Sequence, residues 1–80
     1  MPVILRIKGL KFFFYSNEGQ SPEPAHIHVR HAGSEAKFWL TPEVKLARND
    51  GFDAHTLRRI EKLVTLHRKL FEDSWNEYIT

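Results

Sequence analysis

The sequence predicts an α+β fold, in which an antiparallel sheet of four or five strands carries one long C-terminal helix on one face. Short segments with a side-chain period of two, separated by connections that contain Gly or Pro, fill the first half of the chain and are typical of antiparallel strands. The last third has apolar residues in steps of three and four, which indicates an amphipathic helix. With 80 residues, the chain is expected to form a single domain over residues 1–80.

Residues 3–8 and 11–16 are the first two expected strands. The first is rich in β-branched and large apolar side chains, and the short connection around Gly9 predicts a hairpin. The second contains three consecutive phenylalanines, residues 12–14, which offer apolar groups to both faces. We therefore expect it to lie centrally or beneath the helix. Residues 17–24 are rich in Gly, Ser, Asn and Pro and predict a loop.

Residues 26–31 and 35–41 are the next two expected strands, joined by a turn at Ala32-Gly33-Ser34. A short edge strand over residues 43–46 completes the five-stranded alternative. Two of its residues are expected to point inward: Val44 and Leu46.

The helix is expected to cover residues 54–78, because no Gly or Pro interrupts this stretch. Asp53 suits the N-cap position, and Phe52 before it can meet Leu57 as a hydrophobic staple. A straight helix of this length is roughly 37 Å long, so its end is expected to overhang the sheet. Trp75 and Tyr78 continue the apolar stripe there and suit a partner helix or a homodimer. The basic residues of the helix are interpreted as a solvated face.

The residues around the third strand make the candidate functional surface. His26, His28 and Arg30 alternate with Ile27 and Val29, so the histidines and the arginine share one face. If the third and fourth strands form a hairpin, that face also receives Glu35, Lys37 and Trp39 from the fourth strand. His31 points the other way.

One interpretation of this surface is purely structural: the histidines bond the Pro-rich loop and Trp39 closes a small core. Three functional hypotheses also fit it, and the first is a metal site. Two histidines at positions i and i+2 of a strand, His26 and His28, can converge on one divalent ion. Such a site needs a third ligand and outer partners that fix the histidine tautomers. The candidates for the third ligand are Glu18, Glu23, Glu35 and Asp50.

The second hypothesis is a metal-independent ribonuclease. Cleavage of RNA by attack of the 2′-hydroxyl needs a base, an acid and a cation that stabilises the phosphorane. Histidines titrate near neutral pH and suit the first two roles. The candidate catalytic residues are His26, His28, Arg30, Lys37 and Tyr15.

The third hypothesis is a binding surface without chemistry. Trp39 beside Arg30 and Lys37 could stack a base or receive a side chain of a partner. The function predicted from the sequence is accordingly a small interaction module that binds a protein partner, with RNA as a further candidate partner. The ribonuclease and the metal-binding protein are the alternatives. No cofactor is predicted beyond the divalent ion of the metal alternative.

The chain resembles a family of small bacterial proteins described as domain of unknown function 4160. The resemblance lies in the blocks Phe12-Phe13-Phe14-Tyr15-Ser16-Asn17-Glu18, Pro24-Ala25-His26-Ile27-His28-Val29 and Glu35-Ala36-Lys37-Phe38-Trp39-Leu40. It also includes Gly51-Phe52, Leu57-Arg58-Arg59-Ile60 and Trp75. The resemblance implies a long C-terminal helix and a small protein partner encoded nearby, in a pair of the toxin–antitoxin type. It implies no catalytic residues.

The composition indicates the compartment and the kinds of partner to expect. The absence of cysteine is typical of a reducing compartment, and we expect a cytoplasmic protein. No apolar run approaches the roughly 20 residues of a membrane span, so no membrane is expected as a partner. The net charge of +2 permits a polyanionic partner without requiring one.

Overall fold

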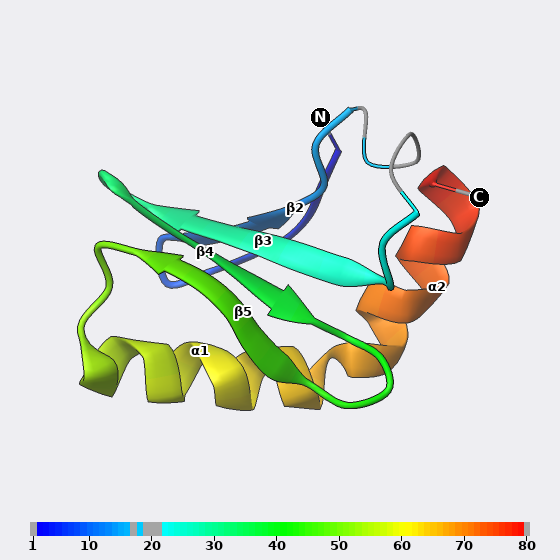
Figure 1. The fold of residues 1–80 in the computed structure, drawn as a ribbon. Helices are drawn as coiled ribbons and strands as arrows, with labels where there is room; N and C mark the ends of the chain where they lie inside the picture. Colours follow the sequence, from blue (N-terminus) through cyan, green and yellow to red (C-terminus); the bar gives the residue numbers. More distant parts are fainter. Residues whose placement is uncertain (1, 17, 19–21, 80) are drawn as a thin grey trace.

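The computed structural model describes residues 2–16, 18 and 22–79 and confirms the α+β class. Its strands are β1 (Val3–Ile7), β2 (Leu10–Phe13), β3 (His26–His31), β4 (Ser34–Trp39) and β5 (Lys45–Asp50). They form one antiparallel sheet whose spatial order is the chain order, β1-β2-β3-β4-β5 (Figure 1). Two helices follow, α1 (Ala54–Leu66) and α2 (Arg68–Tyr78). The described part of the chain has no helix that is both long and apolar enough to cross a bilayer.

The turn between β1 and β2 confirms the expected hairpin. Lys8 and Gly9 have φ angles of 48° and 82°, and Ile7 pairs with Leu10. Positive φ at both central residues is what a two-residue type I′ turn requires. A Cβ atom at Gly9 would lie 3.0 Å from the His31 ring, so a larger residue would have to displace that ring in addition to straining the backbone.

The second strand is shorter than the sequence predicted, since β2 ends at Phe13 and not at residue 16. Beyond it the backbone finds other partners. The Phe14 amide donates to the Pro2 carbonyl at 3.1 Å, and the Tyr15 amide donates to the Glu18 carboxylate at 3.2 Å. The chain therefore leaves the sheet early. The predicted loop over residues 17–24 lies partly outside the described residues.

The edge strand was predicted too early and too short. β5 runs over Lys45–Asp50 and not over residues 43–46, and β4 ends at Trp39 rather than at residue 41. All six residues of β5 are exposed, Leu46 among them, so the backbone ladder to β4 holds this strand rather than burial of its side chains. Val44 lies just outside the strand and packs against the core. An apolar pattern could not locate a strand of this kind.

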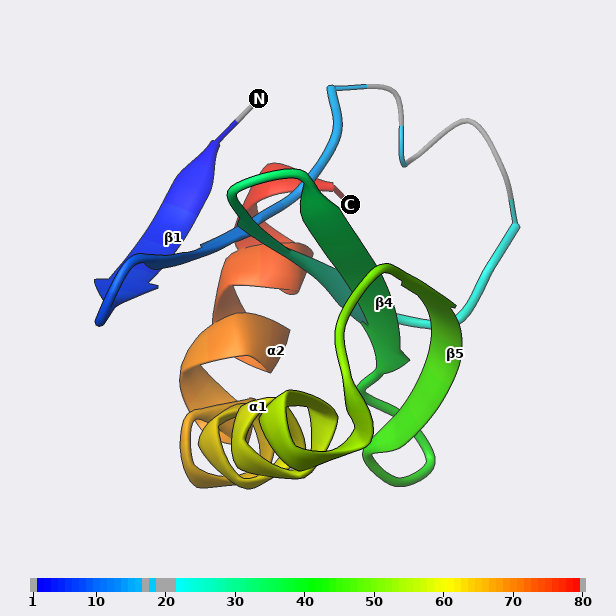
Figure 2. The ribbon, with the colours of Figure 1, turned by 90° about the vertical axis from the view of Figure 1, so that its left-hand side faces the viewer.

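The single long helix was wrong, because the helix breaks at His67 into α1 and α2. The Thr65 hydroxyl donates to the Glu61 carbonyl at 2.9 Å, a side-chain contact that bends helices. Figures 1 and 2 show α1 beneath the sheet and α2 turning up past the end where β3 begins. The bend replaces the expected overhang, because it brings Trp75 into the core with only 7 % of its surface exposed.

The core lies between the sheet and the helices. It contains Phe12, Phe14, Ile27, Val29, Ala36, Phe38, Leu40, Phe52, Ile60, Val64, Phe71 and Trp75. The predicted N-cap is confirmed, since Asp53 accepts a hydrogen bond from the Thr56 amide at 2.7 Å. Phe13 is also fully buried, but it lies on the opposite face with His28. The three phenylalanines thus serve both faces, as the sequence indicated.

Candidate functional site

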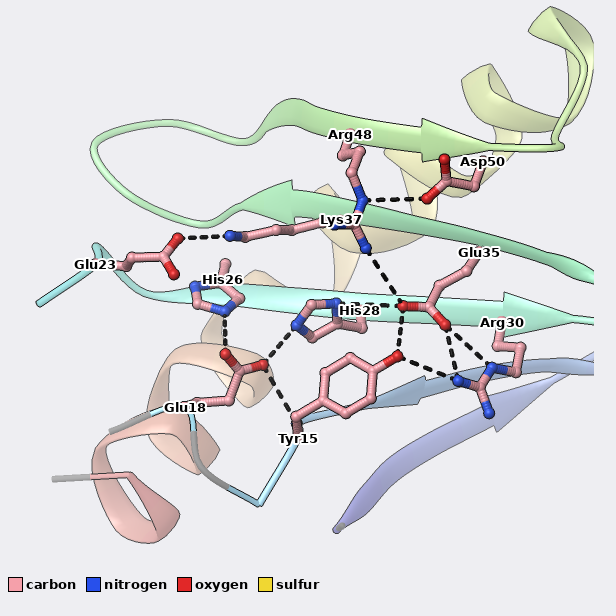
Figure 3. Close-up of polar contacts among 10 residues, drawn as sticks. All are labelled: Tyr15, Glu18, Glu23, His26, His28, Arg30, Glu35, Lys37, Arg48 and Asp50. Carbon is pink, nitrogen blue, oxygen red and sulfur yellow. Dashed lines mark hydrogen bonds and ion pairs between the residues drawn. The ribbon is translucent and has the colours of Figure 1, made fainter. Parts of the chain in front are cut away.

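The strand register brings the predicted surface together. In the β3–β4 hairpin, His26 pairs with Trp39, His28 with Lys37, and Arg30 with Glu35. Figure 3 shows all of these side chains except Trp39 on one face. The two histidines are nevertheless buried, with 0 % and 5 % of their surfaces exposed. The Trp75 ring lies 4.7 Å from His26 and the Tyr15 ring 4.6 Å from His28, so α2 and the segment after β2 cover them.

Glu18 lies between the two histidines (Figure 3). Its Oε2 is 2.7 Å from Nε2 of His26, and its Oε1 is 2.5 Å from Nε2 of His28. Burial alone would raise the pKa of Glu18, but the contact with His26 and the hydrogen bond from the Tyr15 amide outweigh burial and lower it. Burial lowers the pKa of His28 although Glu18 opposes this shift, so His28 is neutral at pH 7.

A second cluster joins Tyr15, Glu35 and Arg30. The Tyr15 hydroxyl donates to Oε2 of Glu35 at 2.6 Å, and Arg30 donates to Oε1 through Nη2 at 2.8 Å and Nε at 3.2 Å. Burial raises the pKa of Glu35, but the hydrogen bonds from Tyr15 and Arg30 together lower it below its ordinary value. Burial, followed by Glu35, raises the pKa of Tyr15, which therefore keeps its proton.

Lys37 and Trp39 are engaged with their own chain. Nζ of Lys37 lies 2.5 Å from the Glu23 carboxylate and 4.5 Å from the centre of the Trp39 ring. Asp50 pairs with Arg48 at 3.1 Å. Of the four candidate third ligands, Glu18 is therefore the one that contacts both histidines, whereas Glu23, Glu35 and Asp50 have basic or hydroxyl partners.

The position of Glu18 limits the acid–base chemistry that the two histidines can perform. Both Nε2 atoms of the histidine pair face Glu18, and both rings are covered. A general acid or base must come within about 3 Å of the proton that it transfers. An RNA 2′-hydroxyl could approach these nitrogens only after Glu18 had moved away. Arg30 is the member of the predicted catalytic set with the most open side chain, 39 % exposed.

A second candidate surface lies at the turn between β1 and β2, and the sequence did not predict it. On the sheet face, Arg6, Lys11 and Arg30 lie opposite one another across β1, β2 and β3 and line a hollow of about 370 Å³. Like charges directly opposite one another destabilise a sheet. Arg30 pairs with Glu35, whereas no ion pair of Arg6 or Lys11 is formed within the described residues.

The other side of the same turn faces α1 and forms the hairpin groove. It joins two hollows, of about 180 and 270 Å³, that share Lys8, Arg59 and Leu63. The full lining is Ile7, Lys8, Leu10, His31, Thr56, Arg59, Ile60, Lys62, Leu63 and Leu66. Within the described ranges, no Asp or Glu lines the groove. The sequence signal was weak, because these residues come from separate elements that only packing brings together.

The family comparison covers most of this arrangement. The family model described as Domain of unknown function (DUF4160) matches residues 9–76. The chain belongs to this family. The matched DUF4160 region includes Glu18, both histidines and most of the hairpin groove. No curated protein and no solved structure matches the chain.

Proposed function

We propose that this DUF4160 domain is an interaction module that binds an acidic, amphipathic segment of a protein partner in the hairpin groove. The observation that carries the proposal is the combination of an apolar lining with unpaired cations. Leu66, at the edge of the groove, is 74 % exposed, although large apolar side chains gain by burial. Lys8, Arg59 and Lys62 stand around it, and no ion pair of theirs is formed among the residues that the structure describes.

The lining favours protein over RNA as the partner. Binding of single-stranded nucleic acid relies on aromatic rings on which bases stack. In the described part of the chain, no Phe, Tyr or Trp lines the groove, His31 is the one aromatic ring of the lining, and its apolar side chains are aliphatic. Leucine and isoleucine side chains suit the apolar face of a helix or strand, and acidic residues beside that face would meet the cations.

A second copy of this chain is a poorer occupant. A two-fold interface places the same patch of both subunits face to face. Two hairpin grooves brought together would bring Lys8, Arg59 and Lys62 of both subunits into one interface, where the described lining offers no carboxylate to pair with them. A partner of opposite charge avoids this repulsion, which supports the hetero-pair that the family resemblance implies, of the toxin–antitoxin type. The Trp39, Arg30 and Lys37 surface remains the alternative site for the same partner.

The test is titration of the purified chain with the small protein that the neighbouring gene is expected to encode, followed by calorimetry. The expected result is a one-to-one complex whose affinity falls as salt rises, because exposed charges are screened. The double substitution Arg59→Glu with Lys62→Glu should weaken binding at least about 10-fold, since it replaces attraction by repulsion.

Arg58→Glu is the matched control, because Arg58 is exposed on the same helix but does not line the groove. It should leave the affinity within about 2-fold. A loss of binding free energy from Arg58→Glu about half that of the double variant, in proportion to its change of charge, would indicate a general charge effect and contradict the groove. Loss on changing Trp39 alone would move the site to the sheet face. Binding of an RNA homopolymer that the double variant abolishes would replace the protein partner by a nucleic acid.

A further inference from the structure

We propose that Glu18, His26 and His28 form a binding site for a borderline divalent cation such as Zn²⁺, a property separate from the proposed partner binding. One nitrogen from each histidine and one carboxylate oxygen lie within 4.8 Å of one another. The set of two imidazoles and one carboxylate is a donor set that zinc uses in proteins. Mg²⁺ and Ca²⁺ prefer all-oxygen sites, which two imidazoles do not provide.

The hydrogen bond of His26 to the backbone fixes its tautomer. Nδ1 of His26 lies 2.9 Å from the Pro24 carbonyl, which can only accept, so Nδ1 carries a hydrogen. In the neutral ring, Nε2 then directs its lone pair at Oε2 of Glu18, 2.7 Å away. A nitrogen lone pair and a carboxylate oxygen repel each other at that distance, so a positively charged atom between Nε2 and Oε2 would stabilise the contact. A proton or a metal ion can supply that charge, and an Nδ1–H···O=C bond is the usual outer partner of a metal-binding histidine.

The second histidine supplies an independent observation. Nδ1 of His28 is buried and has no hydrogen-bond partner among the described residues. If Nε2 donates to Glu18, Nδ1 is left as an orphaned acceptor, which costs free energy. A metal ion on Nε2 would reverse this arrangement, because the ring's hydrogen would then sit on Nδ1. That atom lies 3.8 Å from Oε2 of Glu35, and a slight approach would complete a carboxylate–histidine–metal relay.

The geometry needs a small opening to admit the ion. Donor atoms around a tetrahedral zinc ion are about 3.3 Å apart, given bonds near 2.0 to 2.1 Å. The contacts from the two oxygens of Glu18 to the two histidines are 2.7 and 2.5 Å, whereas the donor atoms span up to 4.8 Å. The carboxylate must therefore withdraw and the imidazole rings must turn toward the ion, each by less than about 1 Å. Glu18 lies outside the strands, whereas both histidines are fixed in β3. With three protein ligands, a fourth position is left for water or a further group, as in catalytic zinc sites.

The experiment titrates metal-stripped protein with ZnCl₂ by calorimetry and counts bound zinc by elemental analysis. We expect one equivalent per chain in the wild type. Glu18→Gln and His28→Ala should each weaken binding at least about 100-fold, and Glu35→Gln, which removes the outer partner, about 10- to 100-fold. His55→Ala is the control, because His55 is exposed at the start of α1, and it should leave the affinity unchanged.

The tautomer of His28 provides a readout on the wild-type protein, so a variant that fails to fold does not decide the matter. Long-range ¹H–¹⁵N NMR should show the hydrogen of His28 on Nε2 without metal and on Nδ1 when zinc is bound. A His28 ring that keeps Nε2–H at saturating ZnCl₂ would overturn the proposal. So would the absence of a one-to-one complex, or a loss of affinity in His55→Ala as large as that in Glu18→Gln.

Discussion

Phe71→Ala is expected to be the most damaging of the helix substitutions, because Phe71 joins α2 to the sheet. Its side chain is 0 % exposed and stacks on Phe12, with ring centroids 5.3 Å apart. Truncation of a fully buried Phe costs about 3 to 5 kcal/mol: the transfer term is about 1.5 to 3, and the cavity and lost ring contacts supply the rest. The whole free energy of unfolding of a domain of this size is about 4 to 12 kcal/mol.

Urea and thermal unfolding measure this loss. At about 4 to 8 °C for each kcal/mol, Phe71→Ala should lower Tm by about 12 to 40 °C. Lys62→Ala, at an exposed site of α1, should change the free energy of unfolding by less than about 0.5 kcal/mol. Phe71→Leu should lose less than Phe71→Ala because it keeps part of the buried surface. Similar effects from Phe71→Ala and Lys62→Ala would refute this assignment of the buried face.

Further predictions concern the polar clusters. The pKa of Glu35 in the folded protein lies below its ordinary value of 4.5, so in acid the unfolded chain binds more protons than the folded one. The stabilisation that ionised Glu35 gives to the fold is therefore complete above about pH 5 and is lost as pH falls through the lower folded pKa. Glu35→Gln should therefore be less stable than the wild type at pH 7 but lose less stability between about pH 5 and pH 3. Free energies of unfolding from urea melts that fall equally with pH in the two proteins would contradict this. The isolated chain should leave varied RNAs uncut from about pH 5 to pH 9, because Glu18 occupies both histidine Nε2 atoms. A bell-shaped cleavage profile that survives chelation and is lost in His26→Ala and His28→Ala would instead establish the ribonuclease alternative.

Local patterns predicted what depends on one or two neighbouring elements. The period of two in His26–His31 placed the histidines opposite Ile27 and Val29, and the register with β4 followed from the same alternation. Asp53 was recognisable as an N-cap because its role depends on the next three residues. These features repeat in the structure as the sequence indicated.

Tertiary packing decided what the sequence did not show. No Gly or Pro marks the helix break at His67 in the sequence. The break places Phe71 and Trp75 against the end of the sheet, and the helical periodicity carries no information about where the sheet ends. β5 lacks a buried face and is held by its backbone pairing. Burial of His26 follows from Trp75, almost 50 positions away in the chain. The hairpin groove likewise needs β1, β2 and α1 to meet before Lys8, Arg59 and Leu66 can share one surface.

Site-specific photo-crosslinking in cells would show whether the hairpin groove receives a protein partner. A benzophenone amino acid at Leu66, in the groove, is compared with one at Leu70, which is exposed on α2 but does not line it. We expect one covalent adduct from position 66 and none from position 70, with the crosslink mapped by mass spectrometry to an acidic, amphipathic segment of the partner. Adducts to RNA, equal adducts from both positions, or an adduct formed only when the probe replaces Trp39 would contradict it.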